Sequence, residues 1–320
     1  MIGEKNGAGT DASVLLSRVP DIHSVSLQGG GDEKIFIHRL DQLFPLASGN
    51  KIYKLLGHLQ AARRANKTQL LSFGGAWSNH LHALAIFARH FNLRCTGFVR
   101  GLYVDIDNPM LKDARAAGMD VRLLSKQEYA RRRDPLFLAE LRSQYPNAWI
   151  IPEGGDDAYG RLGLHHLAAA LTQSIPAGET LIVASGTGAT VRGLAMGLRE
   201  HVQLVSALVV NDQQLAQKLD LLCRLPCDNF RLFECSGAGY GRVDTKLLQQ
   251  LERLYLQSGV LLDPLYNGKA WPLAKKLTRQ GERVHLLHTG GVQGWRGLLS
   301  RGLLAQHREL SYAASHLEFK

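Results

Sequence analysis

One lysine stands where a turn meets an apolar, helix-like run: Lys51 in "ASGNKIYKLLGHL", residues 47–59. A turn lysine is usually a solvated surface charge. An amine held away from water, however, is partly neutral near pH 7 and can act as a nucleophile or a base. Lys51 is therefore a candidate for amine chemistry. Whether it is a surface charge or a reactive amine depends on whether its neighbours in the fold shield it from water.

A loop of small residues follows a strand-like run in "VASGTGATVRGL", residues 183–194. Its glycines let the backbone approach a ligand closely, its hydroxyls can donate hydrogen bonds, and the start of the next helix adds partial positive charge. This pattern predicts a phosphate-binding loop. The predicted loop comprises Ser185, Gly186, Thr187, Gly188, Ala189 and Thr190.

Two nucleotide-binding motifs do not fit this loop. A dinucleotide fingerprint needs glycine at position 191, where Val191 stands, and a P-loop beginning at Gly188 needs lysine where Leu194 stands. The loop thus favours a phosphate over a nucleotide, and a simple glycine-rich turn is the alternative.

Two further loops come directly after strand-like runs. "SFGGAWSNH" places Ser78 and Asn79 at the start of a helix, and "LLHTGGVQG" places Thr289 beside two glycines. Ligands of open α/β sheets bind at the carboxyl ends of strands, so these side chains are candidates to contact a polar ligand. A helix N-cap is the structural alternative for Ser78 or Asn79.

Tyr266 lies in a fourth stretch, "LLDPLYNGKAW", residues 261–271. The Asn267-Gly268 pair after it predicts a turn before a helix that begins with Lys269. A tyrosine at such a break more often packs than reacts, so its pattern alone is weak evidence for function.

Strand-like and helix-like runs alternate along the chain that carries these loops. Short apolar runs bounded by glycine predict buried strands, and longer periodic runs predict helices. The predicted strands are residues 69–73, 94–99, 119–124, 148–152, 180–185, 202–210 and 283–291. The predicted helices are residues 79–91, 108–118, 127–133, 162–175, 245–259 and 269–280. This alternation predicts an α/β fold with parallel sheets covered by helices on both faces.

Composition narrows the class of protein. The 320 residues are 45% hydrophobic, and no run is long and apolar enough for a membrane span. The net charge of +10 would attract anions, but the basic residues are dispersed, and "RRRD" at 131–134 is typical of a solvated helix face. No nucleic-acid-binding signature is present. The four cysteines form no Cys-x-x-Cys pair, so no metal site is predicted.

Taken together and in order, these stretches resemble one family. A lysine after Gly-Asn, Ser-Asn-His at a helix start, a small-residue loop, "YNGKA" and "HTGG" are similar to the pyridoxal-phosphate (PLP) enzymes of the tryptophan synthase β fold. Within these enzymes the chain resembles the group of 1-aminocyclopropane-1-carboxylate deaminase and D-cysteine desulfhydrase. "IFIHRLDQLFPLASGNKIYKL" and "GAGYGRV" (237–243) also match that group, and the resemblance runs from about residue 35 to about residue 297.

The resemblance implies a role for each site residue. Lys51 would carry the cofactor and, once freed, act as the base. Asn79 would bind the cofactor's phenolic oxygen, and Ser78 would face the substrate carboxylate or α-carbon. Residues 185–190 would hold the phosphate. Thr289 would lie against the pyridine nitrogen as a hydroxyl donor, and Tyr266 would be a catalytic or packing group near the substrate.

Two departures from the family pattern concern the substrate more than the cofactor. Ala76-Trp77 precedes Ser78 where the family usually has a glutamine nearby, and Trp77 would reshape the substrate pocket. Tyr53 and Leu56 replace the basic and acidic residues of the family's "K-x-R-K-L-E".

The resemblance predicts a PLP-dependent lyase or deaminase that acts on a small amino acid. The first expectation is D-cysteine desulfhydrase-like elimination to pyruvate, ammonia and sulfide. Deamination of 1-aminocyclopropane-1-carboxylate to 2-oxobutyrate is the alternative within the family, and a non-catalytic anion-binding protein is the alternative from another class.

A composition shift near "PEGGDDAYGRLG", residues 152–163, is a candidate crossing between two lobes. The expected architecture is a two-lobed α/β fold with mostly parallel, twisted sheets covered by helices. Residues 1–50 and 160–320 would form the larger PLP-binding domain, and residues 51–159 a smaller inserted domain. The expected protein is a cytoplasmic homodimer that binds neither nucleic acid nor a membrane.

Overall fold

The computed structural model describes residues 21–27, 33–43, 49–198, 200–223, 229–237, 239 and 241–317, without the side chains of residues 220, 222 and 223. The prediction for the cysteines falls partly outside this description, because Cys227 and the side chain of Cys223 are not covered. The described Cys95 and Cys235 are free thiols.

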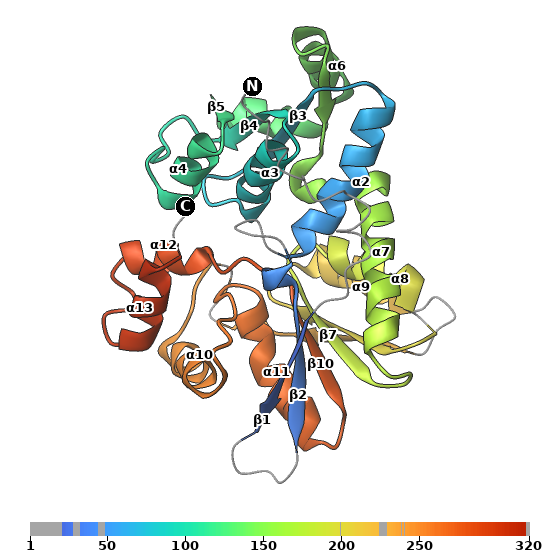
Figure 1. The fold of residues 1–320 in the computed structure, drawn as a ribbon, viewed down its shortest axis with the longest axis vertical. Helices are drawn as coiled ribbons and strands as arrows, with labels where there is room; N and C mark the ends of the chain where they lie inside the picture. Colours follow the sequence, from blue (N-terminus) through green and yellow to red (C-terminus); the bar gives the residue numbers. More distant parts are fainter. Residues whose placement is uncertain are drawn as a thin grey trace, which may run out of the picture.

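A six-stranded sheet forms the lower part of the molecule in Figure 1. Its order is β1 (Ile22–Ser26), β2 (Lys34–Arg39), β10 (Val284–His288), β7 (Thr180–Ser185), β8 (Gln203–Leu208) and β9 (Phe230–Glu234). β1 runs antiparallel to β2, and the other neighbours are parallel. Every residue of β7 and β10 is buried, as expected for central strands with helices on both faces.

A four-stranded parallel sheet forms the upper part (Figure 1). Its order is β5 (Met119–Leu124), β4 (Arg94–Arg100), β3 (Gln69–Gly74) and β6 (Ala148–Ile150). The strands of this sheet thus come from one continuous stretch of chain, and the described strands of the larger sheet flank it in the sequence. The domain boundaries at residues 51 and 159 stay a prediction.

Helices cover both sheets. They are α2 (Asn50–Arg64), α3 (Asn79–His90), α4 (Pro109–Ala116), α5 (Lys126–Ala130), α6 (Pro135–Gln144), α7 (Ala158–Ser174), α8 (Ala189–Leu198), α9 (Gln213–Cys223), α10 (Thr245–Ser258), α11 (Asn267–Arg279), α12 (Gly294–Ser300) and α13 (Arg308–Ser315), with short 3₁₀ turns η1 (Leu40–Gln42), η2 (Arg131–Arg133) and η3 (Glu153–Gly155). In Figure 1, α3, α4 and α6 accompany the upper sheet, and α10, α11 and α13 lie with the lower one. The predicted α/β class is confirmed.

Local sequence explains where many helices begin. Ser78, Asn108, Asp134, Asp157 and Asp244 each accept a hydrogen bond from a backbone N–H in the first turn of the helix that follows. Such caps satisfy N–H groups that have no partner within the helix. The polar residue before an apolar periodic run therefore sets these helix starts.

The chain passes between the two sheets twice, through α2 and α7, which pack against each other by their backbones. A Cβ atom at Gly163 would lie 1.8 Å from the carbonyl oxygen of Tyr53, and one at Gly57 would lie 2.1 Å from that of Tyr159. Any side chain at either glycine would push the helices apart. This tight crossing fixes α2, and with it Lys51, against the rest of the fold.

Several predicted helices have different bounds in the structure, among them the helix predicted for 162–175, which begins at Ala158. The helix predicted for 127–133 ends as α-helix at Ala130 and continues as the 3₁₀ turn η2. The turn predicted at Asn267-Gly268 is instead the first turn of α11, because the Asp263 carboxylate accepts the N–H groups of Leu265, Tyr266 and Asn267 and so organises the approach to the helix. Of the described helices, none combines the length and apolar character that a membrane crossing needs.

Candidate active site

A cavity of about 620 Å³ receives residues from both sheets. The loops after β3, β7 and β10 all contribute to its wall, as expected for the carboxyl ends of parallel strands. All of the predicted site residues line it: Lys51, Ser78, Asn79, Ser185, Gly186, Thr187, Gly188, Ala189, Thr190, Tyr266 and Thr289. The structure therefore brings together side chains that lie up to 238 positions apart (289 − 51) in the sequence.

Lys51 is the second residue of α2, and Gly49 makes its position possible. Gly49 has φ of 99°, and a Cβ atom there would lie 2.0 Å from the carbonyl oxygen of Thr289. That carbonyl accepts the N–H of Asn50 at 3.2 Å. The Gly-Asn pair of the sequence is thus a point where α2 touches the loop after β10, and the next residue enters the cavity.

Burial lowers the pKa of Lys51 from 10.5 to about 8, against the opposing effect of the Asp263 charge. About a tenth of the amine would then be neutral at pH 7, compared with well under a thousandth for a free lysine. The Nζ atom donates a hydrogen bond to Asn50 Oδ1 at 3.1 Å. The lowered pKa of Lys51 supports its interpretation as a reactive amine rather than as a solvated surface charge.

A second buried amine, Lys54, was missed by the sequence analysis. It lies one helical turn after Lys51, lines the same cavity and donates to the carbonyl of Gly154 at 3.2 Å. Burial first, then the charge of Lys51, lowers the pKa of Lys54 to about 7. The signal was the spacing of three in "NKIYK", which places both amines on one helix face.

The loop after β3 forms the wall on the side of the smaller sheet. Ser78 is the N-cap of α3, as one of the two interpretations of the sequence predicted, and its Oγ accepts the N–H of Leu81 at 3.2 Å. Ser78 also lines the cavity. Trp77 is 47% exposed, and its ring lies next to Gly297 of α12, where a Cβ atom would approach it to 3.0 Å. Trp77 therefore reaches across to the larger sheet's side of the cavity.

The predicted phosphate loop joins β7 to α8. Gly188 has φ of 70°, and the first N–H groups of α8 have no partner within the helix. Thr190 Oγ1 accepts from Asn50 Nδ2 at 2.6 Å, which ties the loop to α2 and leaves the hydroxyl proton for another acceptor. The Ser185 hydroxyl accepts from Ser206 Oγ at 2.8 Å within the sheet, and its role in binding a phosphate stays a prediction.

Tyr266 packs over the phosphate loop. A Cβ atom at Gly186 would lie 2.7 Å from a carbon of the Tyr266 ring, so glycine is needed at this contact. The tyrosine immediately precedes α11 and lines the cavity. Its ring therefore helps to shape the loop, which agrees with the packing interpretation of the sequence.

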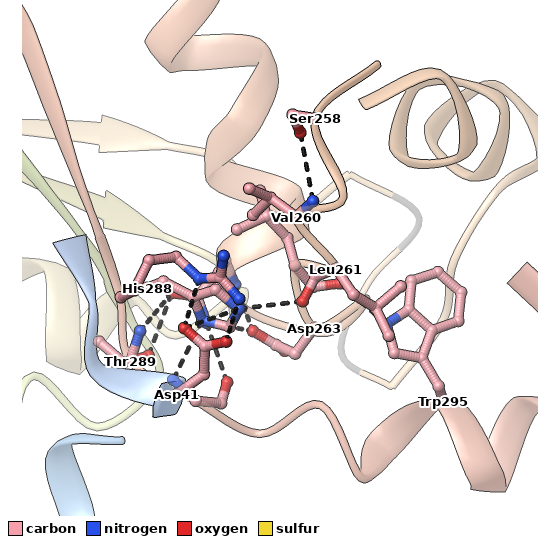
Figure 2. Close-up of polar contacts among 12 residues, drawn as sticks. Asp41, Ser258, Val260, Leu261, Asp263, His288, Thr289 and Trp295 are labelled. Atoms are coloured by element: carbon pink, nitrogen blue, oxygen red, sulfur yellow. Dashed lines mark hydrogen bonds and ion pairs between the residues drawn. The ribbon is translucent and has the colours of Figure 1, made fainter. Parts of the chain in front are cut away.

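Thr289 adjoins a cluster of polar side chains that includes Asp41, Asp263 and His288 (Figure 2). Asn267, fully buried at the start of α11, accepts from both the N–H and the hydroxyl of Thr289 at 3.1 Å. Burial raises the pKa of Asp263, while hydrogen bonds from Asn267 and the His288 charge act in the opposite direction. No site role was predicted from the sequence for Asp263, or for Asn267, although Asn267 belongs to the quoted "YNGKA" stretch.

Ion pairs join the two sides of the cavity. Asp113 of α4 binds Arg296 of α12 and, at 3.0 Å, His82 of α3, and Arg296 and His82 help the pKa of Asp113 to lie below its usual value although burial alone would raise it. Arg192 of α8 binds Asp156 at 2.5 Å. The Asp113–Arg296 pair links α4 to α12, and the Asp156–Arg192 pair links the end of η3 to α8.

Arg133 belongs to the basic stretch that the sequence analysis interpreted as a solvated helix face. It lies at the end of η2, is exposed and also lines the cavity. Its neighbour Arg132 instead binds the Glu153 carboxylate at 2.7 Å. The stretch is therefore partly structural and partly a wall of the site.

Comparison with known proteins identifies the family. The family model described as pyridoxal-phosphate dependent enzyme matches residues 21–290, and the chain belongs to this family. It is therefore a PLP-dependent enzyme, and its cofactor is pyridoxal phosphate.

Individual relatives are more distant. The chain is 27% identical over 289 residues to a Pyrococcus horikoshii protein that bears the provisional name 1-aminocyclopropane-1-carboxylate deaminase, covering 85% of this chain and 88% of that protein. It is 26% identical over 306 residues to the mitochondrial bifunctional D-cysteine desulfhydrase/1-aminocyclopropane-1-carboxylate deaminase of Arabidopsis thaliana, covering 85% and 76%. A solved structure described as an ACC deaminase homologue superposes with a TM-score of 0.72 at 23% identity, covering 92% of this chain and 98% of the other.

The cavity fits the cofactor of this family. An aldehyde needs an amine that is partly neutral, which burial provides at Lys51. A phosphate needs N–H donors and positive charge, which the start of α8 and Lys54 can supply. An aromatic ring needs a slot with polar groups at its edge, and Asn79 and Thr289 both line the cavity.

Proposed function

We propose that this protein is a PLP-dependent lyase that eliminates a β-substituent from a small amino acid, with D-cysteine as the first substrate to test. The observation that carries the proposal is the partly buried Lys51 amine, with its pKa lowered to about 8, in a cavity walled by the loops after β3, β7 and β10. The names of the relatives support the substrate class, since the Arabidopsis protein's name covers both a desulfhydrase and a deaminase.

Each site residue has a proposed task. Lys51 carries the cofactor, and residues 185–190 hold its phosphate. Lys54 adds positive charge on the same helix face, so it is proposed as a counter-charge to that phosphate. Asn79 binds the phenolic oxygen, and Thr289 lies against the ring nitrogen. When bound, the cofactor supplies an electron sink for negative charge that develops on the substrate.

The protein's own groups then select the reaction. Ser78 lies at the N-terminus of α3, where a hydroxyl and backbone N–H groups suit a substrate carboxylate. Lys51 Nζ, neutral after it releases the cofactor, takes the α-proton, and the β-thiol of D-cysteine leaves as sulfide. One water molecule then hydrolyses the remaining unsaturated amine, which gives pyruvate and ammonia. Tyr266 packs beside the substrate.

The alternative within the family is deamination of 1-aminocyclopropane-1-carboxylate, which the name of the Pyrococcus relative favours. Both substrates are small α-amino acids, and they need the same carboxylate site and the same base. Their products differ, because ring opening gives 2-oxobutyrate and no sulfide. The homodimer stays a prediction.

The test uses purified protein, its Lys51→Ala variant and Lys112→Ala, which removes an exposed lysine of α4. Wild type and Lys112→Ala should show a visible cofactor band and retain cofactor after borohydride reduction, and Lys51→Ala should do neither. D-cysteine should then yield sulfide and pyruvate in equal amounts. Release of 2-oxobutyrate from the cyclopropane substrate, without sulfide from D-cysteine, would favour the alternative. Cofactor that binds but is never trapped by borohydride would indicate a non-catalytic binding protein.

A further inference from the structure

A chain of three hydrogen-bonded side chains leads from the interior to the cavity: Asp263, Asn267 and Thr289. Asp263 and Asn267 are 1% and 0% exposed, so their hydrogen bonds are sheltered from water. Figure 2 shows Asp263 and Thr289 in one polar cluster with His288. Thr289 alone of the three lines the cavity. Asn267 contacts the Thr289 hydroxyl directly, and Asp263 acts on that hydroxyl through Asn267.

The donors and acceptors around Asn267 fix the orientation of its amide. Its Nδ2 donates to the Asp263 carboxylate and, at 3.1 Å, to the carbonyl oxygen of Gly290. Its Oδ1 accepts from the N–H of Thr289 at 3.1 Å. A carbonyl can only accept and a backbone N–H can only donate, so the flipped amide would place like groups against each other on both sides.

This orientation decides the direction of the Thr289 hydroxyl. Thr289 Oγ1 lies 3.1 Å from Asn267 Oδ1, which has no proton to give. The single hydroxyl proton of Thr289 must therefore go to Asn267, and toward the cavity the oxygen has only lone pairs. A hydroxyl donor was predicted at this position from the sequence, whereas the structure makes Thr289 an acceptor.

The geometry points to Asp263 and Asn267 as positioning residues that hold the Thr289 hydroxyl as an acceptor and thereby select the protonated form of the cofactor's ring nitrogen. This inference rests on the proposed function, in which Thr289 lies against that nitrogen. An N–H on the ring can donate to Thr289, but an unprotonated nitrogen would face a second acceptor and lose its hydrogen bond.

The acidic side chains in the described part of the cavity wall already have partners, so they are poorly placed to accept from the ring nitrogen instead of Thr289. Glu153 accepts from Tyr129 and Arg132, and Asp156 accepts from Arg192. The neutral Thr289 hydroxyl, polarised by Asn267, thus takes the place that a carboxylate could fill. A protonated ring withdraws electrons more strongly, so the three residues would favour reactions that develop negative charge on the substrate.

The experiment loads the protein with pyridoxal phosphate carrying ¹⁵N in the ring and records the nitrogen resonance at one fixed pH. Wild type is expected in the range of protonated pyridine. Asn267→Ala frees the hydroxyl to donate, so its resonance should move toward the unprotonated range. Ser206→Ala is the matched control: it removes a buried hydrogen bond from another cavity residue, Ser185, and should leave the resonance in place.

A second pair of variants separates positioning from a general structural effect. Thr289→Val removes the hydroxyl while it keeps the shape, and Asn267→Ala should cause no further shift in that background. Asn267→Ser serves the same purpose if the alanine variant does not fold. An unprotonated ring in wild type, or an equal shift from Asn267→Ala with and without the Thr289 hydroxyl, would overturn the inference alone. Failure of wild type to take up the labelled cofactor would overturn the proposed function and the inference with it.

Discussion

The two walls of the cavity are built differently. On the side of the larger sheet, side-chain hydrogen bonds connect Thr289 to Asn267 and Thr190 to Asn50. On the side of the smaller sheet, the loop after β3 carries the half-exposed Trp77, and a Cβ atom at Gly75 would meet nothing within 4 Å. A wall with fixed donors and acceptors suits one constant ligand, whereas a wall with open space can be fitted to different substrates. The comparison therefore separates cofactor binding from substrate choice.

Gly49→Ala should disrupt the wall on the side of the larger sheet most strongly. A Cβ atom 2.0 Å from the carbonyl oxygen of Thr289, at φ of 99°, would separate α2 from the loop after β10. We expect a destabilisation of about 3 kcal/mol or more and a loss of cofactor occupancy of at least about 100-fold. Thermal unfolding and the visible absorbance of the loaded protein measure both effects.

Gly118→Ala is the matched control for that substitution. Gly118 has a similar φ of 91°, but a Cβ atom there would meet nothing within 4 Å. Only the backbone strain, about 1 kcal/mol, should remain, with normal cofactor occupancy. If both variants lost the cofactor equally, strain rather than the close approach to Thr289 would be the cause.

Lys54→Met tests the role of the second lysine that lines the cavity. We expect cofactor affinity to fall about 10- to 100-fold, as for loss of one charged hydrogen bond. The apoprotein should become more stable at pH 7, because burial, followed by the Lys51 charge, lowers the pKa of Lys54 from 10.5 to about 7. The unfolded lysine stays protonated up to about pH 10.5, so wild-type stability rises between pH 7 and pH 10.5 and the advantage of methionine shrinks over that range.

Urea unfolding of the apoprotein at pH 7 and pH 10, together with a cofactor titration, checks this prediction. Lys112→Met, at an exposed position of α4, should change neither quantity. A Lys54→Met protein with unchanged cofactor affinity would remove Lys54 from the phosphate site.

The pH dependence of cofactor attachment sharpens the assignment of Lys51. Burial lowers its pKa to about 8, and only the neutral amine attacks an aldehyde. The rate of attachment to the apoprotein should therefore rise with pH, about tenfold per unit below pH 8, and level off above it. Stopped-flow absorbance gives the profile. A rate that keeps rising to pH 10 would mean that the amine is solvated in the apoprotein.

Trp77→Ala addresses the open wall and should have the smallest effect. Loss of the ring that reaches Gly297 should raise KM for D-cysteine by about fivefold, equivalent to about 1 kcal/mol, and improve binding of amino acids with larger side chains. The cofactor spectrum should not change. Gly75→Ala, in the same loop but facing open space, is expected to leave both quantities near wild type. A changed cofactor spectrum in Trp77→Ala would show that the two walls are not separable.

Much of the fold could be predicted because local chemistry specifies it. The apolar runs at 180–185 and 283–291 contain buried central strands, and the Ser78 cap begins α3 where the sequence indicates. The predicted start of α11 was two residues late, because the Asp263 carboxylate accepts the N–H of Asn267 and so organises the first turn. Periodicity cannot register such a side-chain contact with the backbone.

The sequence by itself determined which loops end buried strands, and therefore that Asn79, Thr289 and residues 185–190 are site candidates. Lys51 was recognised from its place between a turn and a helix-like run. Only the tertiary structure decided their chemistry. The pKa of Lys51 depends on burial by segments distant in sequence, and Lys54 shares its cavity with loops from both sheets. The direction of the Thr289 hydroxyl depends on Asn267, 22 positions away. Desolvation and hydrogen-bond direction are properties of surroundings, and the surroundings exist only once the chain has folded.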